Sequence, residues 1–141
     1  MSKKSDNESK LRKQSLAYRL HDQLLGSEAG RALFDAGHML SNMLMFERAL
    51  ATAQAEVGLS PREAAETISL ACDPAGFDVD AIVKDTAADG NHAIPLVRAL
   101  RAKVEAMNPD HTIYVHHGTT SQDVIDSALM LSVKSALVQT M

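Results

Sequence analysis

The sequence predicts an all-α fold for this chain of 141 residues, on three observations. Apolar residues recur at intervals of three and four along most of the chain, as they do on one face of a helix. Alternating strand patterns are nearly absent, and the one extended candidate, Thr112 to His116, is too short to build a sheet. Aromatic residues make up only 4% of the chain, so small and aliphatic side chains must fill the core, which suits closely packed helices.

The first strongly periodic segment, residues 39–57, predicts a helix that Gly58 stops. Its expected buried stripe consists of Leu40, Met43, Leu44, Leu50, Ala53 and Val57. Ser60, Pro61 and Glu63 then match a capping box with proline at the first helical position. This pattern predicts a second helix that runs to about Ala71.

Two further helices are expected before the last one. Asp78 is placed to cap a third helix, which Gly90 would end. A fourth is expected from about Ile94 to Met107, since the following Asn108-Pro109 cannot continue a helix.

The final helix is expected to begin at Thr120 or Ser121, either of which can cap it. Asp123 falls in its first turn, where the helix dipole favours an acid. Beyond that turn hardly any face is polar, and a helix that is apolar almost all round must be buried on most sides. The preceding helices can cover one side at most, so we expect this helix to need further packing partners.

Composition narrows the classes of function. A formal net charge of -4 lacks the basic excess that binding to a phosphate backbone requires, so nucleic acid is not an expected partner. No apolar stretch approaches the roughly 20 residues that span a bilayer, so no membrane association is expected. The single Cys72 cannot form an internal disulfide, which fits a cytoplasmic protein. Residues 1–15 are polar and basic and are expected to form a disordered tail.

The densest cluster of functional groups lies where a loop turns into the last helix, at His116, His117, Thr119, Thr120, Ser121, Gln122 and Asp123. Unpaired backbone N–H groups at a helix start, with hydroxyl and amide side chains, can hold a carboxylate or a phosphate. A plain N-cap that serves only the helix is the competing interpretation. A metal site is not expected, because the neighbouring His116 and His117 cannot easily point at one ion.

This cluster resembles the first signature region of the fumarase/aspartase superfamily, His-x-Gly-x-Thr-Ser-x-Asp before an apolar helix. The matching residues are His116, Gly118, Thr120, Ser121 and Asp123. The version Thr-Ser-Gln-Asp-Val-Ile-Asp is most similar to the carboxymuconate cycloisomerase branch. Residues 90–104, GNHAIPLVRALRAKV, and the helix at 47–61 are also similar to that branch, so the resemblance covers about residues 16–141. His117 replaces the usual Trp or Tyr, and His92 the usual Pro.

The resemblance implies addition or elimination next to a carboxylate of a small polycarboxylate substrate, with neither a metal nor an organic cofactor. By the same resemblance, His116 would contact the substrate or assist proton transfer, and Asn91 would bind a substrate carboxylate. Thr120, Ser121 and Gln122 would supply donors where negative charge develops.

The resemblance also implies an organisation for the chain. Residues 16–119 would form an amino-terminal helical domain, and residues 120–141 would begin the first long helix of a central bundle. The second signature region and the serine-bearing loop of such bundles are missing from these 141 residues, so this chain alone is expected to be inactive. Members of the family form tetramers in which each active site uses residues of three subunits. The resemblance therefore implies that this chain forms a homo-oligomer, and for so short a chain we expect a dimer.

Two alternatives remain from other classes. In the first, the chain is part of a lyase that acts on adenylosuccinate or another succinyl compound. A phosphate-bearing substrate of that kind would require added basic groups near the site. Otherwise it would be a non-enzymatic helical module that self-associates through Leu129, Leu131 and Val138.

Overall fold

The computed structural model describes residues 27–140, and the expected tail at residues 1–15 lies outside this range. The chain divides into two units, residues 1–32 and residues 33–141. In the first unit, the described part is the short helix α2 (Glu28–Ala32), whose Gly30 N–H donates to Ser27 Oγ at 3.0 Å. Every element named below belongs to the second unit.

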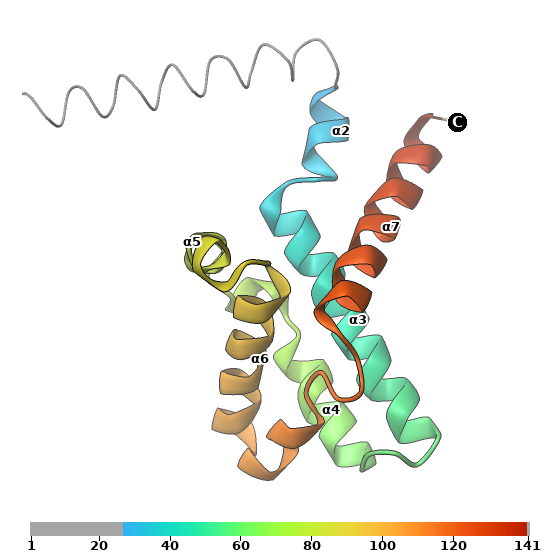
Figure 1. Cartoon of the computed structure of the whole chain (residues 1–141). Helices are drawn as coiled ribbons and strands as arrows, with labels where there is room; N and C mark the ends of the chain where they lie inside the picture. The colour runs from blue at the N-terminus through green and yellow to red at the C-terminus, as the bar shows by residue number, and fades with distance from the viewer. Residues whose placement is uncertain (1–26, 141) are drawn as a thin grey trace, which may run out of the picture. The chain divides into compact units, whose positions relative to one another are not determined.

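The second unit is helical throughout its described residues, as Figure 1 shows. Residues 27–140 contain no strand, which confirms the predicted all-α class. None of the helices in this range is long and apolar enough to cross a membrane. The elements are the α-helices α3 (Ala36–Glu56), α4 (Arg62–Ala71), α5 (Val79–Asp89), α6 (Ala93–Met107) and α7 (Ser121–Thr140) and the 3-10 helices η1 (Pro74–Gly76) and η2 (Pro109–Tyr114).

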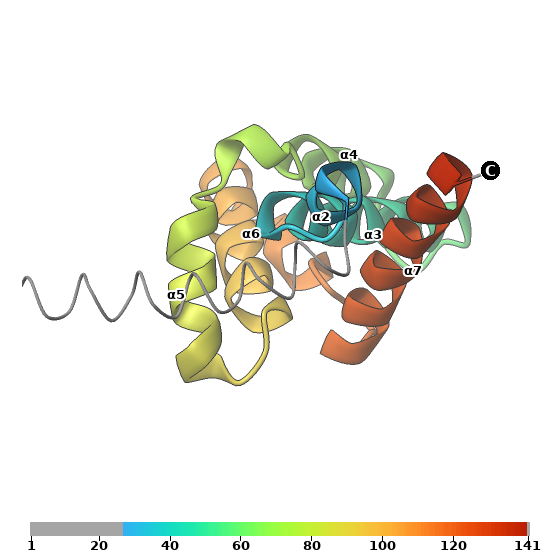
Figure 2. The same cartoon turned by 90° about the horizontal axis from the view of Figure 1, so that it is seen from above.

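Helix α3 is the central element of this unit, with α4 and α7 packed against it (Figures 1 and 2). Helix α6 packs on α4 and α5 packs on α6, so the core lies between α3, α4 and α6. Helix α7 runs antiparallel to α3, since Asn42 near the start of α3 donates to Ser132 Oγ at 3.0 Å, whereas Glu47 bonds to His116 ahead of α7.

Local capping explains most helix ends. Asp78 accepts a bond from the Ala81 N–H at 3.0 Å, and Gly90 ends α5 with a left-handed φ of 80°, as the sequence predicted. The capping box expected at Ser60 is wrong. Pro61 is the N-cap of α4 without a side-chain bond, and the buried Ser60 Oγ has no hydrogen-bond partner among the described residues.

The buried face of α3 differs from the predicted stripe. Leu40, Met43 and Leu44 are buried as expected, but Val57 is 71% exposed and Ala53 is also exposed. The buried face continues instead through Glu47, Ala51 and Gln54. Intervals of three and four fit both stripes, and the prediction chose the apolar one because it assumed that buried residues are apolar. The two polar residues are buried because they bond to the loop before α7.

The extended candidate at residues 112–116 is mostly helical, because residues 109–114 form the 3-10 helix η2 and only the following Val115 is extended. Asn108 Oδ1 accepts a bond from the Asp110 N–H at 3.1 Å, and Pro109 follows at the first position of the turn. Proline fixes φ near the helical value, so this local chemistry outweighs the β-branched residues that follow.

The preceding helices cover one side of α7, as expected. Its buried residues Val124, Ala128 and Ser132 recur every four positions, which places them on one stripe that faces α3. Large apolar side chains remain exposed on its other sides, with exposed fractions of 38% at Leu129 and 68% at Val138. Helix α7 therefore presents an apolar surface that the described chain does not bury.

Candidate functional site

The loop between η2 and α7 has an unusual backbone. His116 has a φ of 59°, and among the described residues it is the one non-glycine residue with a positive φ. Gly118, two residues on, has a φ of 67°. A left-handed residue with a side chain costs roughly 1–2 kcal/mol, so surrounding contacts must hold His116 in this conformation.

Two helices supply those contacts. Gln54 of α3 donates from Nε2 to the His117 carbonyl at 2.7 Å, and Arg101 of α6 donates from Nη2 to the Val115 carbonyl at 3.2 Å. The Val115 side chain is fully buried. The carbonyls on both sides of His116 are therefore fixed to the helical core.

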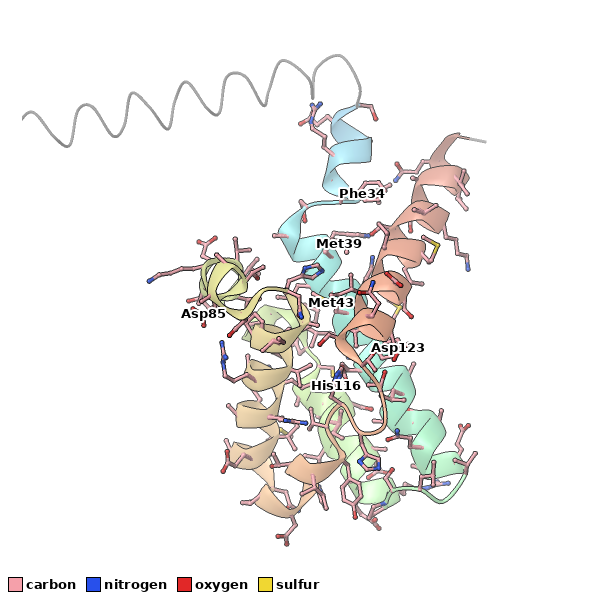
Figure 3. All side chains as sticks on the ribbon, viewed as in Figure 1. Phe34, Met39, Met43, Asp85, His116 and Asp123 are labelled. Atoms are coloured by element: carbon pink, nitrogen blue, oxygen red, sulfur yellow. The ribbon has the colours of Figure 1, made fainter. Side chains whose placement is uncertain are left out.

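The His116 side chain is held as well, by a buried carboxylate. Its Nδ1 lies 2.6 Å from Oε1 of Glu47, and the two side chains are 13% and 1% exposed. The other carboxylate oxygen, Oε2, is buried and has no hydrogen-bond partner among residues 27–140. Figure 3 shows His116 beside the start of α7, close to Asp123.

The start of α7 is a reciprocal capping box. Thr120 donates to Asp123 Oδ2 from its N–H and from its hydroxyl, both at 2.8 Å, and the Asp123 N–H donates back to Thr120 Oγ1 at 3.3 Å. Thr119 adds a third donor to the same oxygen at 3.1 Å. These bonds, the Thr120 N–H first, lower the pKa of the Asp123 carboxyl below its usual range.

Of the five predicted site residues, the structure brings His116 and Ser121 together. Both line a cavity of about 630 Å³ between α6 and the start of α7. Ser121 is partly exposed, and its hydroxyl has no bond to any described residue. Asn91, Thr120 and Gln122 do not line this cavity.

The other three side chains are engaged in local bonds. Asn91 Oδ1 caps α6 by accepting from the N–H groups of Ala93 and Ile94, at 3.0 and 3.1 Å. Gln122 donates to Asp126 at 2.6 Å along the surface of α7. Thr120 uses its hydroxyl in the capping box. Their roles in binding stay predictions, and Asn91 retains its amide N–H₂ for a ligand.

The cavity beside His116 is lined by charged groups of both signs and by hydroxyl side chains. Arg101 and Arg98 both line it, but Arg98 is already paired with Asp89 at 2.7 Å and Asp85 at 3.1 Å. Thr112 contributes a buried hydroxyl that has no partner among the described residues. Glu105 lines the same cavity and offsets part of the positive charge, so the groups that can hold a carboxylate are Arg101 and the Ser121 hydroxyl.

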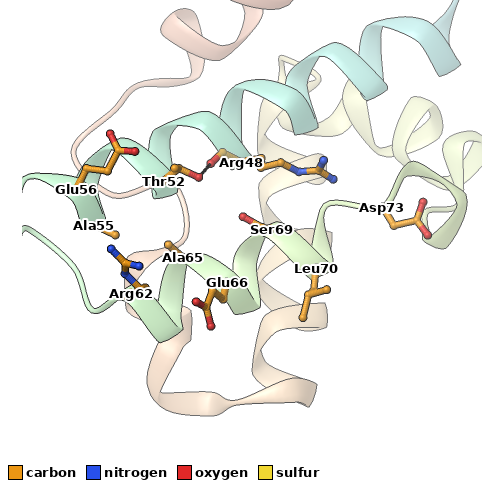
Figure 4. Close-up of a pocket in the computed structure, with 10 residues that line it drawn as sticks. All are labelled: Arg48, Thr52, Ala55, Glu56, Arg62, Ala65, Glu66, Ser69, Leu70 and Asp73. Carbon is orange, nitrogen blue, oxygen red and sulfur yellow. Dashed lines mark hydrogen bonds between the residues drawn. The ribbon is translucent and has the colours of Figure 1, made fainter.

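A larger cavity of about 900 Å³ lies between α3 and α4 (Figure 4). It is lined by two cations and three carboxylates, Arg48, Arg62, Glu56, Glu66 and Asp73, with Thr52, Ser69 and three apolar side chains. These opposite charges nearly balance, so this cavity selects neither anions nor cations. None of the predicted site residues lines it, and we assign the functional site to the smaller cavity.

Sequence reasoning missed three residues that build the site, Glu47, Gln54 and Arg101. Glu47 and Gln54 carried a usable signal, because they continue the buried register of α3 after Met43 and Leu44. A charged residue in a buried register needs a buried partner. Arg101 carried no such signal, since its backbone acceptor at Val115 follows only from the fold.

No protein-family model matches the chain, but individual relatives match most of it. A 3-carboxy-cis,cis-muconate cycloisomerase of Bradyrhizobium diazoefficiens is 46% identical over 114 residues, which are 81% of this chain and 25% of that protein. A nitrosuccinate lyase of Streptomyces davaonensis is 39% identical over 111 residues, 79% of this chain and 23% of that protein.

The fold agrees with these relatives. The crystal structure of the 3-carboxy-cis,cis-muconate lactonizing enzyme from Pseudomonas putida matches with a TM-score of 0.79 and 39% identity, over 86% of this chain and 28% of that one. The chain therefore belongs to the fumarase/aspartase superfamily of lyases and cycloisomerases. Within it, the chain is similar to cycloisomerases of 3-carboxy-cis,cis-muconate and spans about a quarter of their length, 25% of the curated relative above.

Proposed function

We propose that this chain is the amino-terminal part of a cytoplasmic, homo-oligomeric 3-carboxy-cis,cis-muconate cycloisomerase and supplies part of its substrate site. The observation that carries the proposal is the cavity in which His116, Ser121, Thr112 and Arg101 converge. The reaction adds a carboxylate to a double bond of the same molecule to close a lactone. The groups that would hold a substrate carboxylate are Arg101 and the Ser121 hydroxyl, and Glu105 lines the same cavity.

The chemistry of such a reaction places demands that these residues meet. Moving a proton at the carbon next to a carboxylate shifts negative charge onto that carboxylate. Donors that are fixed before the reaction stabilise this charge without reorganising. Ser121 and the first N–H groups of α7 are fixed in this way, because the capping box of Thr120 and Asp123 holds the start of the helix.

A chimera tests the proposal. The matching quarter of the Pseudomonas putida enzyme is replaced by residues 16–141 of this chain, and loss of the muconate absorbance is followed. We expect lactone formation by a chimera of the parent's solution mass. His116→Asn should reduce kcat by about 100-fold, the loss typical for a group that takes part in proton transfer. His117→Asn is the matched control and should leave the rate unchanged, because the side chain of His117 is exposed.

A chimera that has the parent's mass and helix content but does not turn over carboxymuconate would contradict the proposal. The isolated chain should show no turnover, since it spans only a quarter of its relatives. Turnover of an amino- or nitrosuccinate instead would favour a second candidate, a lyase of succinyl compounds, which the similarity to nitrosuccinate lyase supports. A phosphate-bearing substrate is less suited to the cavity, because Arg98 is neutralised by two carboxylates.

A third candidate, a self-associating helical module without activity, is favoured by the surface of α7. Leu129 and Val138 are 38% and 68% exposed, and a cavity of about 570 Å³ between α3 and α7 is lined by Met45, Phe46, Met130 and Leu131 among others. A homo-oligomeric enzyme is expected to have the same apolar surface, so the surface does not separate the two candidates. The chimera assay does, because only the enzyme candidate predicts turnover.

A further inference from the structure

The buried carboxylate of Glu47 has no part in the function proposed above. It lies on α3, 69 residues before His116 in sequence, and is 1% exposed. Burying an ionised carboxylate is costly unless it is paired, and here Nδ1 of His116 is its one hydrogen-bond partner among the described residues. A Glu on the buried face of α3 therefore lowers the stability of the fold unless its pairing compensates, which suggests that it has another role.

The contact between the two side chains fits one position of the imidazole proton. With Glu47 ionised, its carboxylate only accepts hydrogen bonds, so the 2.6 Å contact assigns the proton to Nδ1 of His116. In the neutral ring the other nitrogen, Nε2, then has a free lone pair. Nε2 has no bond to any residue in the range 27–140, and His116 lines the cavity shared with Ser121.

We propose that Glu47 is a positioning residue that holds His116 as the Nδ1–H tautomer, so that Nε2 faces the cavity as a proton acceptor. When Nε2 takes a proton from a group bound in the cavity, the electron pair stays on that group and the Glu47 carboxylate balances the charge of the imidazolium. This inference rests on the proposed function only for the identity of the bound group.

The backbone around His116 serves the same end. The left-handed φ of 59° is held from both sides by Gln54 and Arg101, which hydrogen-bond to backbone carbonyls and not to the imidazole. Backbone and ring are thus fixed by separate contacts. A variant at Gln54 loosens the loop and leaves the ring contact, whereas a variant at Glu47 does the reverse. Comparing the two variants therefore distinguishes a residue that positions the imidazole from one that only stabilises the loop.

The test uses the 141-residue chain labelled with ¹⁵N-histidine, at a pH where imidazoles are neutral. In the wild type we expect a pyrrole-type ¹⁵N shift at Nδ1 and a pyridine-type shift at Nε2 of His116, assigned by the signals lost in His116→Asn. Glu47→Met removes both oxygens and fills similar space, and should move the proton towards Nε2. Gln54→Met is the matched control on the same face of α3 and should leave the tautomer unchanged.

A wild-type His116 with its proton mainly on Nε2 would overturn the proposal, and this result needs no variant to fold. An unchanged tautomer in a folded Glu47→Met chain would also overturn it. In the chimera, Glu47→Met should lower kcat by about 100-fold with little change in KM, whereas His117→Asn, whose side chain is exposed, should not. An inactive chimera with the expected tautomer refutes the proposed function alone, and an active chimera with the wrong tautomer refutes this inference alone.

Discussion

Removing His116 should cost this chain more stability than removing His116 and Glu47 together. The reason is the unequal exposure of the pair, 13% for His116 and 1% for Glu47. In His116→Ala the carboxylate stays buried with no hydrogen-bond partner for either oxygen among the described residues. In the double variant His116→Ala with Glu47→Met, that carboxylate is gone and an apolar side chain fills its place.

The size of each effect follows from this environment. Breaking a buried ion pair on one side costs about 3–5 kcal/mol, because an uncompensated charge remains. Replacing both partners by apolar groups of similar shape is often nearly neutral, so the second substitution should recover about 2 kcal/mol or more. The strain of a non-glycine residue at the φ of 59° is the same in both variants and cancels from the comparison.

Urea unfolding followed by far-ultraviolet circular dichroism measures the difference, at one protein concentration because self-association shifts the apparent stability. His117→Ala is the control and should change the free energy of unfolding by less than about 0.5 kcal/mol, since only its backbone carbonyl is engaged. A double variant that is less stable than His116→Ala would refute the reasoning, because the carboxylate would then be stabilising without its partner.

Four other properties can be tested on the same chain. Thr120→Ala should lower the free energy of unfolding by about 1 kcal/mol, measured by urea titration, because the N-cap of α7 is lost. Because the pKa of Asp123 is lowered in the folded chain, its carboxylate contributes to the free energy of unfolding fully above about pH 4, and this contribution is lost as the pH falls through the lowered pKa. Asp123→Asn should remove this part of the acid dependence in unfolding curves recorded from pH 2 to 6. We expect the chain to self-associate through α7, and the double variant Leu129→Glu, Val138→Glu should be monomeric in sedimentation velocity; an unchanged mass would contradict an interface on α7. Burial first, and then the charge of Glu47, raise the pKa of the Cys72 thiol to about 12, so alkylation at pH 8 should be slow in the folded chain and fast in urea.

The sequence predicts this fold where the signals are local. Asp78 and Gly90 mark the ends of α5, and Asn108-Pro109 ends α6, because caps and prolines act within a turn of their own position. The same logic failed at Ser60, where Pro61 takes the N-cap position instead. A capping box requires the hydroxyl residue itself to be the N-cap, and sequence spacing does not settle which residue that is.

The candidate site was predictable only in part, because its key contact is not local. His116 and Ser121 were found from their motif, but Glu47 lies 69 residues from its partner and was passed over in favour of an apolar stripe. A search for hydrophobic periodicity assigns apolar residues to the buried face, so it overlooks a buried polar residue whose partner lies far away in sequence. A charge in register with Met43 and Leu44 is the feature that such a search should keep.

The structure also separates two tasks that the motif combines in eight residues. Thr120 and Asp123 bond to one another and hold the start of α7, so their substitution should act on the stability of the helix before it acts on a ligand. His116 and Ser121 have atoms that no described residue engages, and both face the cavity. Helix capping and ligand binding compete for the same hydroxyl and N–H groups at a helix start, and here they are divided between neighbouring residues. Under the proposed function, this division would account for Thr followed by Ser, because the Thr120 hydroxyl caps the helix and the Ser121 hydroxyl has no bond to a described residue.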